Sequence, residues 1–172
     1  DRTKSRGLGD VYKRQAICLV KKNPMETILQ KATELGVSRI TPIISERTEV
    51  KELNYERAQK IVIEATEQSD QLNPPELSQV IKLKDFLKKL DNRSKFLFAD
   101  VNSQNNLKKK DVEGDTLKTI LIGPEGDFSP NERVSILAKV NITSFSISKN
   151  ILRSDTAVIS AISLVNFINN SH

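Results

Sequence analysis

The chain has 172 residues, of which 28% are charged and 37% hydrophobic, and its formal net charge is +5. This length and balance exclude an intrinsically disordered protein and fit one globular domain with a sizeable core. No apolar run approaches the roughly 20 residues of a membrane span, and the single cysteine, Cys18, excludes an internal disulfide. A reducing, cytoplasmic setting is therefore expected. The positive charge favours a polyanionic partner, with nucleic acid as a candidate.

The N-terminal part of the chain combines an irregular leader with two regular segments. Residues 1–15 mix basic residues and glycines without apolar periodicity and predict a loose leader. Residues 16–20, AICLV, predict a short strand. Residues 23–36 predict a helix that Asn23 caps and that Gly36 ends, since glycine readily adopts the backbone conformation found at helix C-termini.

A strand, a helix and two weaker elements follow. Residues 39–45 predict a strand, and Pro42 inside it favours a sheet edge or a strand end, because proline has no amide hydrogen to donate. Residues 54–69 predict an amphipathic helix with Asn54 as its cap. Residues 77–90 predict a weak strand and then a short amphipathic helix.

The next segments alternate again between strand and helix. Residues 95–100 predict a strand that ends in a carboxylate, and residues 101–115 predict a polar, lysine-rich loop. Residues 116–122 predict a strand that is buried on both faces. A capping box at Ser129, followed by proline, predicts the start of a helix over residues 130–140.

Two further elements complete the chain. Residues 142–148 alternate apolar and polar side chains and predict a strand. Residues 155–170 predict a helix that is apolar on nearly every side, buried in the core or in a subunit interface, with Asp155 or Thr156 as its cap. Strands and helices alternate throughout, which indicates the α/β class with a mostly parallel sheet.

Two loops at strand ends have the composition of a ligand site, because ligands of open α/β sheets bind beyond the carboxyl ends of the strands. In the loop GPEGDF, Gly123 and Gly126 allow the backbone to approach a ligand closely, and Pro124 stiffens the turn. In the loop KNILRSD, Arg153 precedes an apolar helix, where an arginine pairs with a carboxylate or faces a ligand. Neither G-x-G-x-x-G nor G-x-x-x-x-G-K-[ST] is present, which speaks against the alternative of a domain that binds NAD or ATP.

Four sequence blocks follow one another in a characteristic order and spacing: LQKATELGVSRITPIISERT, IEATEQSDQLNPPEL, LIGPEGDFSPNE and SISKNILRSDTA. Together they resemble the ribosomal RNA small subunit methyltransferase E family, whose members are uridine N3-methyltransferases of the SPOUT superfamily. The resemblance covers about residues 16–172. The chain departs from the usual family pattern at Asp127, where glycine is common, and at Asp155, where a glutamate is common.

The resemblance implies a fold, a cofactor and partners. The implied fold is of the SPOUT type, an α/β domain with a mostly parallel sheet flanked by helices and a C-terminal trefoil knot. The implied cofactor is S-adenosylmethionine (SAM), and the implied partners are 16S rRNA of the small ribosomal subunit and a second copy of the chain. The family carries an N-terminal β-barrel RNA-binding domain. We therefore expect the chain to be a fragment, with a leader at residues 1–15 that is not native and a methyltransferase domain at residues 16–172.

The resemblance also assigns roles to individual positions. We expect SAM to be bound by Phe98, Ala99, Asp100, Ile122, Gly123, Pro124, Glu125, Gly126, Ile147, Ser148, Ile151, Leu152 and Arg153. We expect RNA to be contacted by Arg39, Arg47, Glu67, Gln68, Lys108 and Lys109. No cluster of histidine, cysteine and carboxylate residues has the spacing of metal ligands, so no metal is expected.

Methylation at N3 of uracil requires removal of the N3 proton and stabilisation of the imide charge that forms. The expected catalytic residues are Arg153, Glu125 and Asp155. Arg153 donates to the uracil oxygens or holds a phosphate, whereas the proton acceptor is Glu125, Asp155, Glu67 or bulk water. Two alternatives stay open: methylation of the ribose 2′-O or of another base nitrogen, and a SAM-binding dimer that is inactive without its RNA-binding domain.

Overall fold

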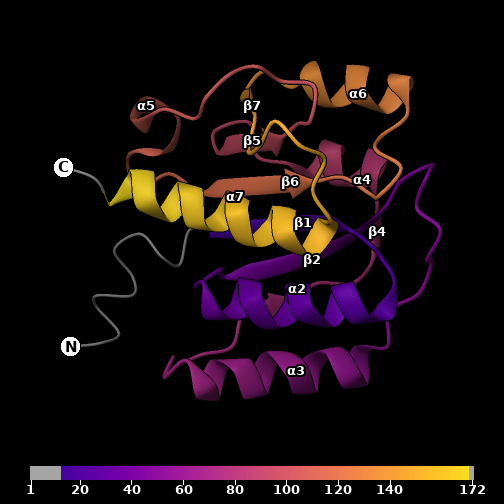
Figure 1. Ribbon diagram of the computed structural model, residues 1–172, viewed down its shortest axis with the longest axis vertical. Helices are drawn as coiled ribbons and strands as arrows, with labels where there is room; N and C mark the ends of the chain where they lie inside the picture. Colours follow the sequence, from indigo (N-terminus) through magenta and orange to yellow (C-terminus); the bar gives the residue numbers. More distant parts are fainter. Residues whose placement is uncertain (1–12, 171–172) are drawn as a thin grey trace.

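The computed structural model describes residues 13–170, and a parallel sheet forms its middle layer (Figure 1). Residues 1–12 of the predicted leader lie outside the described residues. The described strands are β1 (Lys13–Cys18), β2 (Arg39–Ile44), β3 (Glu76–Leu77), β4 (Ile81–Lys82), β5 (Lys95–Ala99), β6 (Lys118–Ile122) and β7 (Ile142–Phe145). They lie in the order β3-β2-β1-β6-β5-β7, with β4 also paired to β2, and these pairings are parallel. The predicted α/β class is confirmed.

Helices cover both faces of the sheet. They are α2 (Lys22–Glu34), α3 (Tyr55–Gln68), α4 (Leu83–Lys89), α5 (Lys109–Val112), α6 (Pro130–Leu137) and α7 (Ser154–Asn169). On one face α2 and α7 pack side by side, and α3 packs against the outer side of α2 (Figure 1). On the other face α4 and α6 contribute to a second apolar cluster. The alternation along β6 divides its side chains between the two layers, because Ile120 and Ile122 join the first cluster and Leu121 joins the second.

Two strand predictions are wrong in detail. β1 begins at Lys13, so Lys13, Arg14 and Gln15 belong to the strand and not to the leader. Pro42 lies on a strand with partners on both sides, since β2 pairs with β1 and also with the short strands β3 and β4. Pro42 has its register partner on β1, and the other side of β2 is unpaired between β3 and β4. This gap accommodates a residue that has no amide hydrogen.

The helix ends agree with the sequence at some positions and not at others. The Asn54 side chain accepts a hydrogen bond from the Arg57 amide, and Ser129 and Glu132 form the predicted capping box. Gly36 follows α2 with a φ of 87°, as expected of a helix stop. The Asn23 cap is wrong, however, because α2 begins one residue earlier, at Lys22, without a side-chain cap.

Two further corrections concern the C-terminal part. The predicted polar loop contains the short helix α5. Neither Asp155 nor Thr156 caps α7, because Arg153 occupies the cap position and Ser154 begins the helix. From β7 at the sheet edge the chain returns through residues 146–153 to α7, which packs on α2 and β6. This return path is consistent with the trefoil knot implied by the resemblance, and the knot stays a prediction.

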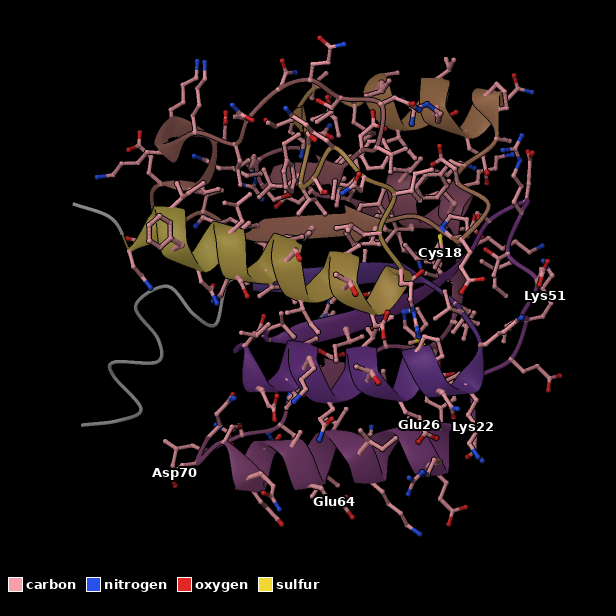
Figure 2. All side chains as sticks on the ribbon, viewed as in Figure 1. Cys18, Lys22, Glu26, Lys51, Glu64 and Asp70 are labelled. Atoms are coloured by element: carbon pink, nitrogen blue, oxygen red, sulfur yellow. The ribbon has the colours of Figure 1, made fainter. Side chains whose placement is uncertain are left out.

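Cys18 is a core residue of β1. It lies inside the molecule, whereas Lys51 and Asp70 lie at the surface (Figure 2). Its sulfur contacts the hydroxyl group of Ser45 at 3.7 Å. Burial raises the pKa of the thiol to about 12, because desolvation disfavours the thiolate. Cys18 is therefore a small apolar packing residue and not a nucleophile.

Candidate cofactor and active site

A cavity of about 290 Å³ lies beyond the carboxyl ends of β5 and β6. The loops that follow β5, β6 and β7 form its walls, together with the first turn of α7. The expected cofactor residues that line it are Ala99, Asp100, Ile122, Gly123, Pro124, Glu125, Gly126, Ile147, Ser148, Ile151 and Leu152. The structure thus brings together, around one cavity, two loops that are more than twenty residues apart in the sequence.

Sequence reasoning missed part of the lining. The additional lining residues are Val101, Asp127, Asn150, Ser154 and Ala157. Each is next to, or within a few residues of, an expected position, so a wider window around the two loops is the signal that finds them.

Two expected cofactor residues lie outside the lining. The Phe98 ring is buried behind the cavity and packs edge-to-face on the Phe128 ring, with 5.7 Å between the centroids. The Arg153 side chain is 73% exposed, and its Nε lies 3.4 Å from the Asp155 carboxylate. The sequence allowed this arginine either to pair with a carboxylate or to face a ligand, and the structure shows the pairing. The ligand-binding role of both residues stays a prediction.

The loop after β6 needs glycine for a reason that differs from the expected one. A Cβ atom on Gly123 would lie 2.9 Å from a carbon of the Phe128 ring, so close packing requires the missing side chain. The left-handed backbone conformation belongs to Asp127, with a φ of 62°. The Asp127 amide donates to the Pro124 carbonyl at 2.9 Å and closes the turn. The bend is therefore held by its own hydrogen bond and by the aromatic ring beneath it.

Arg133 of α6 holds the acidic wall of the cavity. Its guanidinium donates two hydrogen bonds to Asp100, at 2.7 and 2.9 Å, and lies 3.9 Å from Asp127. It also lies over the Phe98 ring, 5.8 Å from the centroid. The ion pair is largely withdrawn from water, since the side chains of Arg133 and Asp100 are 19% and 4% exposed. Arg133 therefore joins the loop after β5 to the loop after β6.

The ionisation of this pair follows from its contacts. Burial raises the pKa of Asp100, but the hydrogen bonds from Arg133 and the Asn102 amide and the charge of Arg133 outweigh it, so the pKa lies below its ordinary value. The hydrogen bond to Asp100 raises the pKa of Arg133. The charge of Arg133 is thus shared between Asp100 and Asp127, and Glu125 adds a further carboxylate to the cavity.

The expected RNA-binding residues do not gather around the cavity. Arg47 is the exception, because its Nη1 donates to the Gly126 carbonyl at 3.1 Å and joins the loop after β2 to the cavity loop. Glu67 and Gln68 are exposed on the last turn of α3, the outer helix of Figure 1. The exposed Lys108 and Lys109 lie at the start of α5, and Arg39 pairs with Glu76 at the beginning of β2. The role of each residue in RNA binding stays a prediction.

Neither a metal site nor a membrane-spanning helix is found in residues 13–170. There, no three side chains of histidine, cysteine, aspartate or glutamate are placed to hold a metal ion. In the same part of the chain, none of the helices has the length and apolar character needed to cross a membrane.

The parallel α/β architecture and its cavity agree with what the chain matches among known proteins. Residues 14–166 match the model of the RNA methyltransferase domain, and the chain belongs to this family. Two curated relatives are the ribosomal RNA small subunit methyltransferases E of Rickettsia conorii, 34% identical over 154 residues, and of Aquifex aeolicus, 38% identical over 150 residues. The matches cover 89% and 83% of this chain and 63% of either relative. The chain thus spans less than two thirds of their length, and the resemblance seen in the sequence is confirmed.

Solved structures give the same picture. The ribosomal RNA small subunit methyltransferase E of Neisseria gonorrhoeae, bound to SAM, superimposes with a TM-score of 0.85 at 28% identity, over 92% of this chain and 67% of that one. A methyltransferase of Legionella pneumophila in complex with SAM gives 0.80 at 30% identity, over 93% and 67%. The TrmH/SpoU tRNA modifying enzyme of A. aeolicus, at 13% identity and a TM-score of 0.56 over 95% of this chain and 79% of that one, shows the fold alone. The SPOUT-type fold expected from the sequence is confirmed.

Proposed function

We propose that this chain is the catalytic domain of a SAM-dependent methyltransferase that modifies N3 of a uridine in 16S rRNA. The observation that carries the proposal is the single cavity that the loops after β5, β6 and β7 form at the carboxyl ends of the strands. The family to which the chain belongs and the SAM-bound structures that it resembles support the same reading.

The lining fits the chemistry of SAM. Ile122, Ile147 and Leu152 offer apolar walls for an adenine ring, and the backbone of residues 123–126 offers amides and carbonyls for its polar edge. Glu125 and Asp127 offer negative charge for a cationic sulfonium or ammonium group. A cavity of about 290 Å³ lies at the lower end of the usual range for small-molecule sites.

The residues of the chain bind the cofactor, orient the uracil ring and accept a proton from it. When bound, SAM supplies the methyl group. The bends after β6 and β7 hold the donor and exclude water on the protein side. Arg153, at the N-cap of α7, donates to the uracil oxygens as N3 loses its proton, and this proton passes to a single acceptor, Glu125 or Asp155. Asp155 is held in place by Arg153 and by the Thr156 amide.

Exposed apolar side chains support a second copy of the chain as a partner. Ile151, at the cavity, is 87% exposed, and Val101, which also lines the cavity, is exposed as well. Apolar side chains at the rim of a site are typical of a surface that another molecule covers. We infer that the active form is a homodimer whose cofactor cavities lie near the interface, with the small ribosomal subunit as substrate.

The proposal is tested by two measurements on the same preparation. We expect calorimetry to show SAM binding and no comparable binding of ATP. We expect nucleoside mass spectrometry of 16S rRNA incubated with the protein and SAM to show 3-methyluridine. A 2′-O-methyl product, or ATP binding in place of SAM, would overturn the proposal.

Arg153→Gln separates catalysis from cofactor binding. We expect the rate of methyl transfer to fall by about 100-fold, the usual effect of removing one donor to a developing anion. The dissociation constant of SAM should change much less, because Arg153 is not among the residues that line the cavity. The matched control is Lys149→Gln, which removes an exposed cation from the same loop and leaves the rate unchanged. Equal rates for the two variants would show that Arg153 has no part in the transfer.

A further inference from the structure

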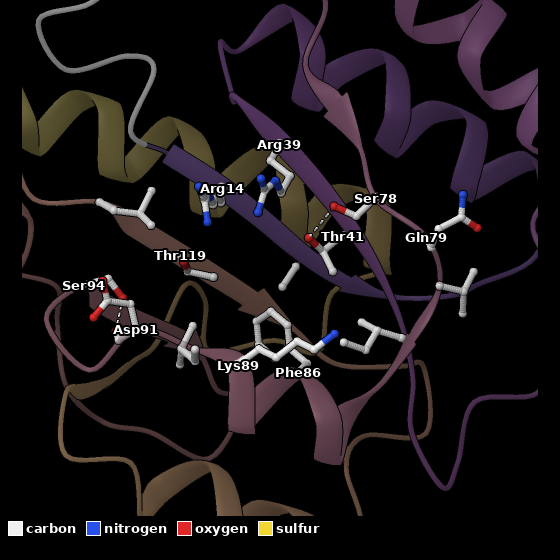
Figure 3. Close-up of a pocket in the computed structure, with 15 residues that line it drawn as sticks. Arg14, Arg39, Thr41, Ser78, Gln79, Phe86, Lys89, Asp91, Ser94 and Thr119 are labelled. Carbon is white, nitrogen blue, oxygen red and sulfur yellow. Dashed lines mark hydrogen bonds between the residues drawn. The ribbon is translucent and has the colours of Figure 1, made fainter.

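A second cavity, of about 400 Å³, lies at the amino ends of the central strands, whereas the cofactor cavity lies beyond carboxyl ends (Figure 3). Its floor is formed by the first residues of β1, β2 and β6, and its walls by the end of α4, the turn that precedes β5 and the segment between β3 and β4. Along β6, Thr119 of this cavity and Ile122 of the cofactor cavity are three residues apart, about 10 Å, and their side chains point to opposite faces of the sheet. It is therefore a distinct site.

The floor of the second cavity is polar, whereas the rest of the same sheet face is apolar. Along β1 this face carries Arg14, Ala16 and Cys18, because side chains alternate between the faces of a strand. Ala16 and Cys18 belong to the apolar cluster beneath α4 and α6, whereas Arg14 lines the cavity. Arg39 on β2 and Thr119 on β6 continue the polar end of the face, since both are register partners of Arg14.

Two arginines thus lie side by side on neighbouring strands (Figure 3). Like charges at directly adjacent strand positions destabilise a sheet. Arg39 is compensated, because its Nε and Nη2 donate to one Glu76 oxygen at 3.1 and 2.9 Å. Arg14 has no such partner, since within residues 13–170 its side chain makes neither a hydrogen bond nor an ion pair, and Glu76 acts on it only through its charge. Burial and then the charge of Arg39 lower the pKa of Arg14, and the charge of Glu76 offsets this effect only in part.

The other walls add donors. Lys89 of α4 brings a third cation, and Thr41, Ser78 and Thr119 bring hydroxyl groups (Figure 3). The carboxylate in the lining, Asp91, is engaged at Oδ1 by the amide and the Nε of Arg93. The cavity therefore offers Arg14 and Lys89, which have no ion-pair partner within residues 13–170, Arg39, which is shared with Glu76, and hydroxyl donors. Cations and hydroxyl groups are the donor set that proteins use for phosphate groups.

We propose that this second cavity binds a phosphate group, held by Arg14, Arg39 and Lys89. The phosphate belongs either to an RNA backbone or to a small nucleotide, and both sources share this chemistry. The Phe86 ring, which lines the cavity beside Lys89, offers an apolar surface for the sugar or base attached to the phosphate. This inference does not rest on the proposed function, because binding of phosphate requires neither SAM nor methyl transfer.

Inorganic phosphate is the first probe. We expect phosphate to raise the Tm of the wild-type chain more than chloride at the same ionic strength, because it binds the folded state. Arg14→Gln should weaken phosphate binding at least about tenfold, because the variant lacks a charge-assisted hydrogen-bond donor. It should not lower the Tm in phosphate-free buffer, since it removes like-charge repulsion. Lys89→Gln serves as a second variant and should also weaken phosphate binding. Lys60→Gln on α3 removes an exposed cation far from the lining and is the matched control, which should respond to phosphate as the wild type does.

A short single-stranded RNA is the second probe and identifies the source of the phosphate. If the ligand is RNA, Arg14→Gln reduces the slope of log affinity against log salt by about 0.7, the usual value for one phosphate neutralised on a single strand. If the slope is unchanged while the variant no longer responds to phosphate, the ligand is a small nucleotide. The inference is overturned if chloride acts as phosphate does, if both variants respond like Lys60→Gln, or if an acidic peptide raises the Tm and phosphate does not.

Discussion

Replacing Arg133 with methionine should lower the free energy of unfolding by about 3 kcal/mol at neutral pH, the usual cost of removing one partner from a buried ion pair. The Asp100 side chain is only 4% exposed, and Arg133 supplies its charge partner and two hydrogen bonds, besides the one from the Asn102 amide. Methionine fills a similar volume without a donor, so the buried carboxylate is left uncompensated. Urea denaturation at constant temperature measures the loss.

The same variant has a defined pH dependence. Because the pKa of Asp100 lies below its ordinary value in the folded chain, the ion pair contributes stability above the unfolded pKa of about 4, and this stability is lost as the pH falls through the folded pKa. The difference in free energy of unfolding between wild type and Arg133→Met should therefore be largest at pH 7 and should become smaller in strong acid. An exposed pair supplies the control: Arg93 is 92% exposed beside Asp91, and Arg93→Met should not change stability measurably. Equal stabilities for the two variants would contradict the role of Arg133.

Gly123→Ala should have the second large effect, because the added carbon would lie 2.9 Å from the Phe128 ring. The ring cannot yield freely, since it packs on Phe98, which in turn lies under Arg133. We expect a loss of about 2 kcal/mol in the free energy of unfolding from overpacking. We also expect SAM binding to weaken by at least about tenfold, equivalent to 1.4 kcal/mol, because the bend that faces the cavity must move.

Gly126→Ala is the matched control for this substitution. Its new carbon would lie 3.8 Å from the nearest atom, on Arg47, which is ordinary contact, so stability should stay close to wild type. The dissociation constant of SAM, measured by calorimetry, and the Tm, measured by thermal unfolding, are compared between the two variants. If the two alanine variants behave alike, the packing against Phe128 does not explain the glycine at position 123.

The sequence predicted the general site because the site follows from local pattern. A buried strand followed by Gly123 and a capping box at Ser129 indicates where a strand ends and a helix begins, and ligands bind at such ends. Arg133 could not be found in this way, because an arginine in the middle of a polar helix looks like a solvated residue. Its partner Asp100 is 33 positions away, and their contact depends on the order of the strands, which sequence periodicity does not contain.

The wrong helix caps have a local explanation. Pro24 can occupy any position in the first turn of a helix, since the first amides have no partner within the helix. It therefore indicates that a helix begins nearby without specifying the first residue, and α2 begins at Lys22 and not after Asn23. The second cavity also escaped prediction, because Arg14 was placed in the leader and its neighbour Arg39 becomes adjacent only when β1 and β2 pair.

The central position of β1 has a consequence for synthesis of the chain. Lys13 at its start is the register partner of Lys118 on β6, so one side of this strand has no neighbour until the ribosome has made more than 100 further residues. During that interval the strand, which contains the apolar residues Ile17 and Cys18, presents unpaired backbone groups along one edge. An exposed strand edge of this kind is prone to association with other nascent chains. Contacts so distant in sequence also close slowly, so folding should be completed only after the C-terminal half emerges.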